Sequence, residues 1–319
     1  MRVQLPVSVC SAFTYLLVFG ACQVNPPDTR DAGLILDQVA SWNLGPLAEF
    51  QAGAVLDGGR VVATFRNGAA RWFEPGETGP FAEHHTDPLH LITPDYESTG
   101  ASVQAVSLVS GSIVELSALG DVVPLDRSCL AARDAVALAA GPGILLAVFP
   151  EREKNRHRVV LFGLSKGRQC LGRDTTYIAC DRGTPSLTAL KARSTFLGCA
   201  HPGQPLFSLR ILNDSRLILR EIEGSTPPAP DQIGGLWYGL PIVRTEEGLL
   251  RVVSDLRNER RRVERWDQHG RHVTTTELDW PLGTVASLPE HRYLLIARGG
   301  SPAELVLYKW SRVPRNTSR

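Results

Sequence analysis

The sequence lacks the short motifs that mark many catalytic sites. It contains no G-x-S-x-G nucleophile elbow, no H-E-x-x-H zinc motif, no Asp-box of the sialidase type and no G-x-x-x-x-G-K-[ST] phosphate loop. These absences exclude the enzymes that are recognised by such motifs. A catalytic site assembled from dispersed carboxylates leaves no local pattern and is not excluded.

Long apolar runs are also missing, apart from one at the N-terminus. The segment from Leu5 to Phe19 follows Arg2 and is shorter than the ~20 residues of a membrane-spanning helix. Its position and length predict a secretory signal. The 319 residues are 43% hydrophobic and 21% charged with a net charge of +1, which is typical of a folded soluble domain and does not indicate nucleic-acid binding.

A cysteine ends this apolar segment. The stretch Phe19-Gly20-Ala21-Cys22 resembles the lipobox of bacterial lipoproteins, although that family prefers Leu or Val where Phe19 stands. In that family the cysteine thiol receives a diacylglyceryl group, the peptide is cut directly before it, and the new amino terminus is acylated. The resemblance implies a signal peptide over residues 1–21 and lipidation of Cys22. An ordinary signal cut a residue or two away and a buried N-terminal helix are the alternatives.

Lipidation would anchor the chain to a membrane without a spanning helix. Two or three acyl chains make such attachment effectively permanent. Gln23, rather than Asp, follows the cysteine, which by analogy with lipoprotein sorting in some Gram-negative bacteria implies the outer membrane. Residues 22–32 then form a tether, and the paired prolines in QVNPPDTRDA predict an extended segment that reaches roughly 30 Å.

Beyond the tether the sequence predicts β-strands, and no convincing amphipathic helix is present. Short β-branched and aliphatic runs alternate with Gly, Pro, Asn and Asp. The clearest runs are residues 60–65, 102–109, 144–149, 158–164, 216–222, 249–256 and 293–297. Evenly spaced short strands are typical of a sandwich, a barrel or a propeller.

Internal similarity favours the propeller. Three segments align on the glycine of a predicted hairpin turn: IVELSALGDVV (113–123), VLFGLSKGRQC (160–170) and VERWDQHGRHV (263–273). The units recur about every 40 to 55 residues, which is the period of four-stranded propeller blades. Two units, residues 54–79 and 287–310, resemble kelch-type repeats, in which paired glycines end the second strand, as Gly299 and Gly300 do here.

We therefore predict an all-β, six-bladed propeller over residues 33–310, with seven blades as the alternative and residues 311–319 as a flexible tail. The blades are expected at residues 48–87, 88–128, 129–177, 178–228, 229–280 and 281–310. The last unit supplies only three strands. Gly33 to Ser41 is an apolar strand without a unit of its own, so we expect it to pair as the outer strand of the last blade and close the ring.

Four cysteines remain after Cys10 is removed with the signal and Cys22 carries lipid: Cys129, Cys170, Cys180 and Cys199. An even number in an exported chain predicts disulfides. Zinc is the rival interpretation, but no C-x₂-C pair is present. Three pairings are possible. We favour a bridge between Cys180 and Cys199. In the expected layout, Cys180 lies in the linker that enters blade four and Cys199 lies at the end of the second strand of that blade, and these two positions are on the same face. We expect Cys129 in a linker between blades and Cys170 inside an outer strand, so a bridge between these two is less favoured.

Two further segments carry candidate site residues. EHHTDPLH (83–90) offers His84, His85, Asp87 and His90 as weak candidate metal ligands, against a polar loop between blades. The segment 257–272 contains six arginines that could bind an anionic glycan, phosphate or carboxylate, against a solvated face neutralised by Asp255, Glu259, Glu264 and Asp267. We favour the structural interpretation of both segments, and we assign neither a metal nor a cofactor.

The function predicted from these features is binding. We expect an envelope-anchored lipoprotein whose propeller binds a protein or glycan partner. The alternative is a secreted or surface enzyme, such as a polysaccharide hydrolase or lyase, with carboxylates in the propeller channel. Fold alone does not choose between them, although binding is favoured.

Overall fold

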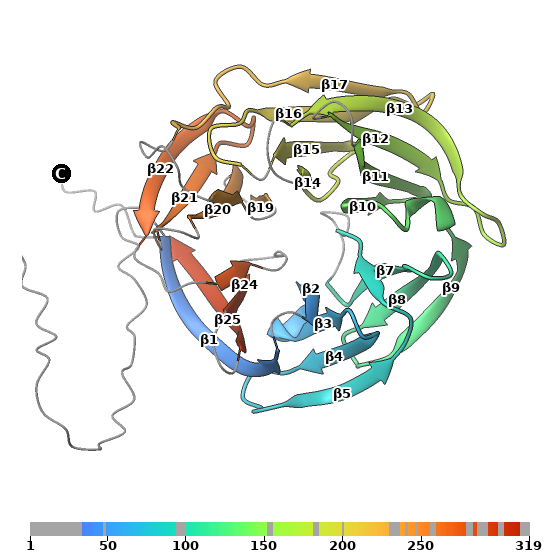
Figure 1. Cartoon of the computed structure of the whole chain (residues 1–319), viewed down its shortest axis with the longest axis vertical. Coiled ribbons are helices and arrows are strands. Elements are labelled where there is room, and N and C mark those ends of the chain that lie inside the picture. Colours follow the sequence, from blue (N-terminus) through green and yellow to red (C-terminus); the bar gives the residue numbers. More distant parts are fainter. Residues whose placement is uncertain are drawn as a thin grey trace, which may run out of the picture.

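The computed structural model of the chain describes residues 34–46, 49–93, 100–151, 156–180, 185–199, 201–229, 237–239, 242–245, 248–255, 260–278, 283–285, 293–298 and 303–312. These residues form an all-β propeller, in which successive sheets follow one another around a common centre (Figure 1). Within the described ranges, no helix is long and apolar enough to cross a membrane. Cys22 and the predicted signal and tether lie outside the described residues.

The described strands form six antiparallel sheets. The first contains β2 (Phe50–Val55), β3 (Val61–Phe65), β4 (Ala69–Phe73) and β5 (Pro80–His85). The second contains β6 (Leu89–Leu91), β7 (Ser102–Ser107), β8 (Ser112–Ser117) and β9 (Val122–Ser128). The third contains β10 (Ala137–Gly141), β11 (Ile144–Glu151), β12 (Arg156–Gly163) and β13 (Leu171–Ala179).

The remaining strands form three further sheets, and the last of them also contains the N-terminal strand β1. The fourth sheet contains β14 (Pro185–Leu187), β15 (Ser194–Cys199), β16 (Leu206–Ile211) and β17 (Leu217–Glu221). The fifth contains β18 (Trp237–Gly239), β19 (Val243–Thr245), β20 (Gly248–Asp255), β21 (Arg260–Trp266) and β22 (His272–Leu278), with β18 and β19 both paired to β20. The last contains β23 (Gly283–Val285), β24 (Tyr293–Arg298), β25 (Ala303–Arg312) and β1 (Leu34–Gly45).

The seven apolar runs in the sequence all coincide with strands of this fold. All five residues of β3 are buried, because the second strand of a sheet packs against the neighbouring sheets on both of its faces. The outer strand of the same sheet, β5, is mostly exposed and correspondingly polar. Inner strands therefore have continuous apolar runs, whereas outer strands carry the charged residues.

The aligned glycines mark the turns between the third and fourth strands of their sheets. Gly120, Gly167 and Gly270 have φ values of 92°, 68° and 82°, a region that glycine adopts without steric cost. Each turn contacts the preceding sheet: an added Cβ on Gly120 would lie 2.7 Å from Ala82, and the Gly167 amide donates to the Asp126 carbonyl at 2.7 Å. The repeat in the sequence thus reflects the contacts that join one sheet to the next.

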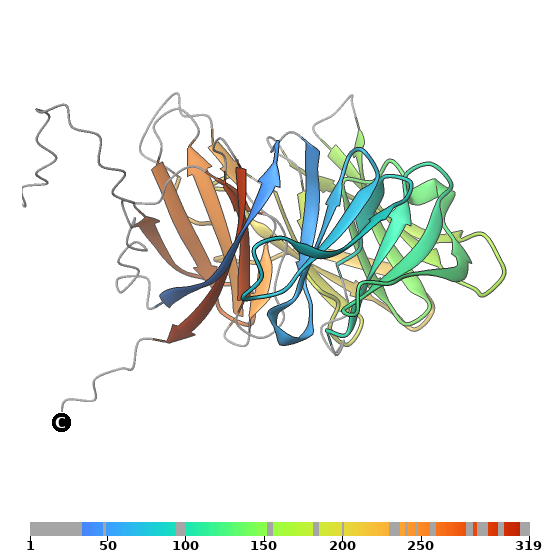
Figure 2. The same ribbon diagram turned by 90° about the horizontal axis from the view of Figure 1, so that it is seen from below.

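The N-terminal strand lies against the C-terminal strand. β1 pairs with β25 over its whole length and forms the outer edge of the last sheet (Figure 2). It extends four residues beyond the predicted end at Ser41, because Trp42 and Leu44 are buried in a cluster with side chains of both the first and the last sheets. The Trp42 ring lies 5.4 Å from that of Phe73, and its indole N–H donates to the Glu74 carbonyl at 3.3 Å.

Two disulfides join segments that are distant in the sequence. The favoured pair, Cys180 and Cys199, is bonded with a Cα separation of 5.6 Å, and both residues are buried. Cys129 and Cys170 form the second bridge, with a Cα separation of 4.9 Å. The assignment of Cys170 to an outer strand was wrong: it directly precedes β13, and its amide donates to the Ser128 carbonyl at 2.8 Å, which brings it beside Cys129.

Replacing Cys180 and Cys199 together by alanine is expected to lower the free energy of unfolding by about 3 kcal/mol, since the bridge closes a loop of 19 residues in sequence separation. Urea titration of both proteins measures the difference. Ala131→Gly, at an exposed position, serves as a control substitution that leaves both disulfides intact. An unchanged midpoint in the double variant would show that this bridge does not constrain the unfolded chain.

Candidate functional site

The four candidate metal ligands do not converge. His84 and His85 lie on β5 rather than in the loop that the sequence suggested. His84 contacts the edge of the Trp72 ring at 5.6 Å, and the Asp87 carboxylate accepts a hydrogen bond from the Ser107 hydroxyl at 2.8 Å. Among the residues that the structure describes, no group of three His, Cys, Asp or Glu side chains is arranged to hold a metal ion.

Three histidines instead have lowered pKa values. Burial lowers the pKa of His90, partly offset by a hydrogen bond to the backbone of Ala135, and burial alone lowers the pKa of His157. Burial also lowers the pKa of His272, whose ring nitrogen lies 2.8 Å from the Thr275 hydroxyl. As the pH falls, each of these imidazoles therefore stays neutral in the folded protein after the same imidazole in the unfolded chain has begun to bind a proton.

Stability is expected to fall as the pH is lowered below about 6.5, the ordinary pKa of histidine. The unfolded chain binds protons on these histidines before the folded protein does, so protonation favours unfolding, whereas above this pH both states are neutral and no stability is lost. Urea titrations at pH 8 and pH 5 measure the difference, and His90→Gln should reduce it. Gln38→Ala, at an exposed position without a titratable group, should leave it unchanged; an equal reduction in both variants would contradict this origin.

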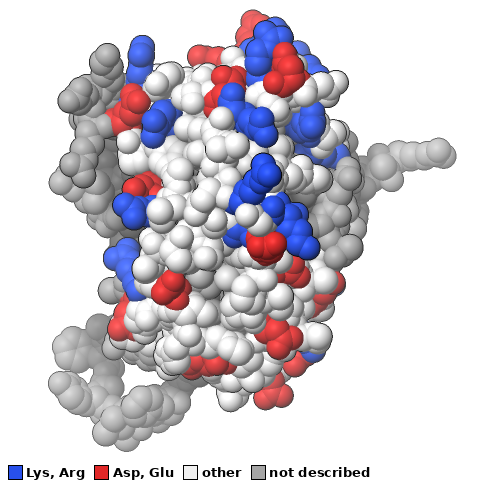
Figure 3. Space-filling model, turned by 90° about the vertical axis from the view of Figure 1, so that its right-hand side faces the viewer, with Lys and Arg blue, Asp and Glu red and all other residues white. Residues whose placement is uncertain are grey.

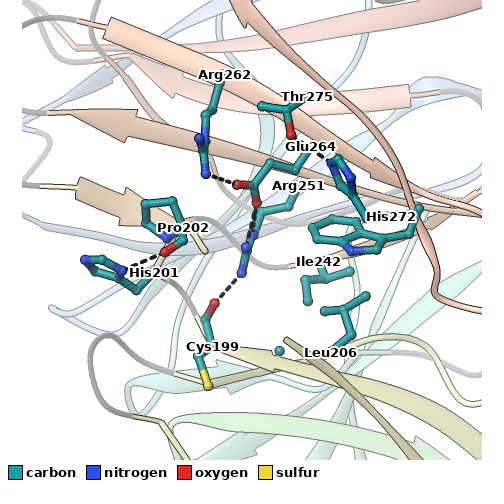
Figure 4. A network of polar contacts seen from close by, with 12 residues as sticks. Cys199, His201, Pro202, Leu206, Ile242, Arg251, Arg262, Glu264, His272 and Thr275 are labelled. Atoms are coloured by element: carbon teal, nitrogen blue, oxygen red, sulfur yellow. Dashed lines mark hydrogen bonds and ion pairs between the residues drawn. The ribbon is translucent and has the colours of Figure 1, made fainter. Parts of the chain in front are cut away.

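The arginine-rich hairpin is solvated only in part: Arg271 beside its turn is exposed, whereas two of its charged residues lie in the interior. Arg262 is 3% exposed and Glu264 is fully buried. Both carboxylate oxygens of Glu264 are used: Oε1 accepts from Arg262 at 2.6 Å, and Oε2 accepts from Nε of Arg251 at 2.8 Å (Figure 4). Asp255 is also fully buried. The hairpin thus places balanced charges inside the protein, where pairing is required.

This buried ion network lies between the fourth and fifth sheets. Arg251 on β20 stands directly across from Glu264 on β21, and its guanidinium donates to the Cys199 carbonyl on β15 (Figure 4). The same guanidinium lies 5.3 Å from the centre of the Trp266 ring, whose N–H donates to the Ser225 carbonyl at 2.6 Å. The network therefore ties β20 and β21 to the backbone beside the Cys180–Cys199 disulfide.

Sequence reasoning missed Arg251. It interrupts the apolar run LLRVVSD of a central strand, and such an interruption by a charged residue is the signal that could have indicated a buried ion pair. Its partner could not be identified without the register between β20 and β21. The network is buried and joins two sheets, so its role is structural.

The exterior is divided by charge. The outer hairpins of the first two sheets, β4–β5 (69–85) and β8–β9 (112–128), carry six acidic and two basic residues. The outer hairpins of the next two sheets, β12–β13 (156–179) and β16–β17 (206–221), carry eight basic and three acidic residues. We call these four hairpins the outer wall. Figure 3 shows this side of the molecule, with Lys and Arg gathered in the upper half and Asp and Glu predominant below.

Exposed apolar side chains accompany these charges. Five of the nine exposed large hydrophobic residues lie on the outer wall: Phe81, Leu119, Val123, Leu171 and Tyr177. Leu119 is 76% exposed and Leu171 is 62% exposed. Apolar groups together with arginine and tyrosine are features of protein interfaces.

Comparisons with known proteins show no family for this chain. No protein-family model and no curated protein sequence matches this chain. Among solved structures, BamB from Moraxella catarrhalis is similar over 89% of this chain and 100% of that chain, with 14% sequence identity and a TM-score of 0.39. The β-propeller domain of Cps50 (Swd1) from Myceliophteria thermophila is similar over 82% of this chain and 83% of that chain, with 10% identity and a TM-score of 0.46.

Proposed function

We propose that this protein is an envelope-anchored lipoprotein whose propeller is a rigid platform that binds a protein or glycan partner. One observation carries the proposal: consecutive sheets are fastened to one another by turn contacts, disulfides and the buried ion network. A platform fixed in this way can present its exposed loops and outer strands to a partner with little loss of conformational entropy on binding.

The proposed architecture assigns one blade to each of the six sheets, with β1 as the outer strand of the last blade. The domain boundaries follow: residues 1–21 are the signal peptide, 22–32 the tether, 33–310 the propeller and 311–319 the tail. The relation of two units to kelch repeats stays a prediction. Because β1 is the first strand after the tether, the anchored end of the chain enters the last blade.

The anchor itself is Cys22, by the lipobox resemblance, and the proposed location is the outer membrane. Wild-type protein is expected to incorporate a fatty-acid analogue during growth and to fractionate with membranes, because acylation makes attachment effectively permanent. Cys22→Ser should abolish the label. Label retained in the serine variant, or absent from wild type, would exclude lipidation at this residue.

Partner binding is tested separately from anchoring. The full chain, purified in a non-ionic detergent, is immobilised and exposed to solubilised envelope proteins and to an array of envelope glycans. The proposal expects a component that is retained in stoichiometric amounts and displaced by the free protein. Heat-unfolded protein on the same support is the matched control. Equal retention by the folded and unfolded supports, or no retention on either test, would contradict a binding function.

A further inference from the structure

Two exposed apolar residues of the first and second sheets are neighbours in space. Phe81 on β5 is 41% exposed, and Leu119, in the turn between β8 and β9, is 76% exposed. Gly120 follows Leu119, and a Cβ added to this glycine would lie 3.2 Å from the Phe81 ring. The turn that carries Leu119 therefore packs beside this ring. We call Phe81 and Leu119 the apolar pair. Neighbouring exposed apolar side chains, unlike single ones, mark candidate binding surfaces.

The turn that carries Leu119 is held in place by the preceding sheet. The indole N–H of Trp72 on β4 donates to the Ser117 carbonyl at 2.7 Å. Arg60, directly before β3, donates from Nη1 to the Ala118 carbonyl at 3.2 Å. Within the turn, the Ser117 hydroxyl accepts a hydrogen bond from the Leu119 amide at 3.2 Å. Leu119 is thus presented to solvent by a turn whose backbone is fixed on both sides.

The Phe81 ring is directed outward by an irregularity in its strand. The register between β4 and β5 shifts between Trp72 and Phe73, which leaves Phe81 as the extra residue of a bulge. Such bulges re-aim a side chain away from the regular alternation of a strand. The Arg60 guanidinium lies 5.7 Å from the centre of the Phe81 ring and is itself paired with Glu74 at 2.8 Å. The ring is therefore also supported by the first sheet.

Acidic side chains lie beside the apolar pair. Asp121 is two residues from Leu119, and Glu77 is in the turn between β4 and β5, where its amide donates to the Glu74 carbonyl at 3.2 Å. We call Asp121 and Glu77 the acidic rim. Both are exposed, and within the described residues no ion pair involves either of them. Because Arg60 is already paired with Glu74, the rim keeps its negative charge.

We propose that the apolar pair and the acidic rim bind a segment of another protein that carries lysine or arginine next to apolar side chains. The inference rests on the proposed binding function and names its surface and the chemistry of its partner. Apolar side chains of the segment cover Phe81 and Leu119, and its cations pair with the rim, which gives the apolar centre and polar edge that protein interfaces have. The same rim repels anionic glycans and anionic lipids. Because the surface is already fixed, binding orders few further groups.

Synthetic peptides test this chemistry on the full chain, purified in a non-ionic detergent. The probe is a short fluorescent peptide of alternating lysine and leucine, and its affinity is measured by fluorescence anisotropy. In one comparison peptide glutamate replaces every lysine, and in another serine replaces every leucine. Only the lysine–leucine peptide is expected to bind well, because it alone supplies both kinds of side chain. Its affinity should fall as the ionic strength is raised, since salt screens exposed charges.

Two variants remove the two parts of the surface separately. Leu119→Ala truncates the apolar pair, and Glu77→Gln with Asp121→Asn neutralises the acidic rim. Each should weaken binding of the lysine–leucine peptide by about tenfold, as the loss of a central contact or of paired charges does at interfaces. The matched controls, at exposed positions on other sheets, should bind as the wild type does: Leu171→Ala, and Glu221→Gln combined with Glu223→Gln.

Four results would overturn the proposal. These are a lysine–leucine peptide that does not bind, a comparison peptide that binds equally well, an unchanged affinity in either variant, or an equal loss in the controls. A doubled molar mass in light scattering that Leu119→Ala reduces would assign the surface to a second copy instead. An envelope component retained equally by the wild type and Leu119→Ala would overturn this surface but not the binding function. Preserved thermal melting of each variant excludes misfolding as the cause.

Discussion

Glu264→Ala is expected to lower the free energy of unfolding by about 3–5 kcal/mol. Glu264 is fully buried and accepts hydrogen bonds from both Arg251 and Arg262. Its removal leaves two guanidinium groups in the interior with one carboxylate fewer. Because a domain is typically stable by only about 5–15 kcal/mol, the variant should be close to unfolding at ambient temperature.

A double variant that removes both Arg251 and Glu264 leaves neither member of this pair as an unpaired buried charge. Comparing it with Glu264→Ala shows how much of the loss in the free energy of unfolding comes from the unpaired arginine rather than from the missing ion pair. Arg251→Met combined with Glu264→Leu removes one charge of each sign and should destabilise the protein less than Glu264→Ala alone. Glu221→Ala, on an exposed outer strand, is the control for loss of a carboxylate. Urea titration measures all three. Equal losses in Glu264→Ala and Glu221→Ala would show that the network contributes nothing specific.

Deletion of residues 34–45 should abolish cooperative unfolding or lower the melting temperature strongly. β1 provides the outer edge of the last sheet, and its Trp42 and Leu44 are each 1% exposed between the last and first sheets. Loss of the strand exposes the edge of β25 and opens a cavity beside Phe73. Trp42→Ala alone should lower the free energy of unfolding by about 3–5 kcal/mol, as replacements of other buried aromatic residues by alanine do.

An exposed position on the same strand gives the matched control. Gln38→Ala keeps the strand and its pairing with Tyr308 and should change stability by less than about 0.5 kcal/mol. Thermal melting and light scattering together distinguish loss of stability from aggregation. A deleted protein that melts cooperatively at the temperature of the intact chain would show that the propeller does not need β1.

The strands could be predicted from the sequence because the inner strands of each sheet are buried on both faces. Runs such as ILLAVF and RVVATF have few alternatives to a central strand, and the glycine turns give the hairpins between them. The pairing of Cys180 with Cys199 followed from the same layout. These features depend on local patterns and on the order of strands, which a repeated architecture makes regular.

Features that depend on register could not be predicted. The meeting of Arg251 with Glu264 requires the alignment of β20 and β21, and the position of Cys170 depends on where β13 begins. The division of the outer wall by charge is present in the composition of successive hairpins. Recognising it requires knowing that these segments are the outer hairpins of successive sheets.

β1 pairs with β25 at the outer edge of the last sheet, and the proposed closure of the propeller depends on this pairing, which an engineered cross-link tests most directly. Asp37 and Lys309 are exposed partners in the register of these strands, whereas Asp37 and Glu304 are not. Cysteines at positions 37 and 309 should form a disulfide on mild oxidation, which peptide mass mapping without reduction detects, while cysteines at 37 and 304 should stay reduced. Failure of the first pair to cross-link, or equal cross-linking of both pairs, would contradict closure by the N-terminal strand.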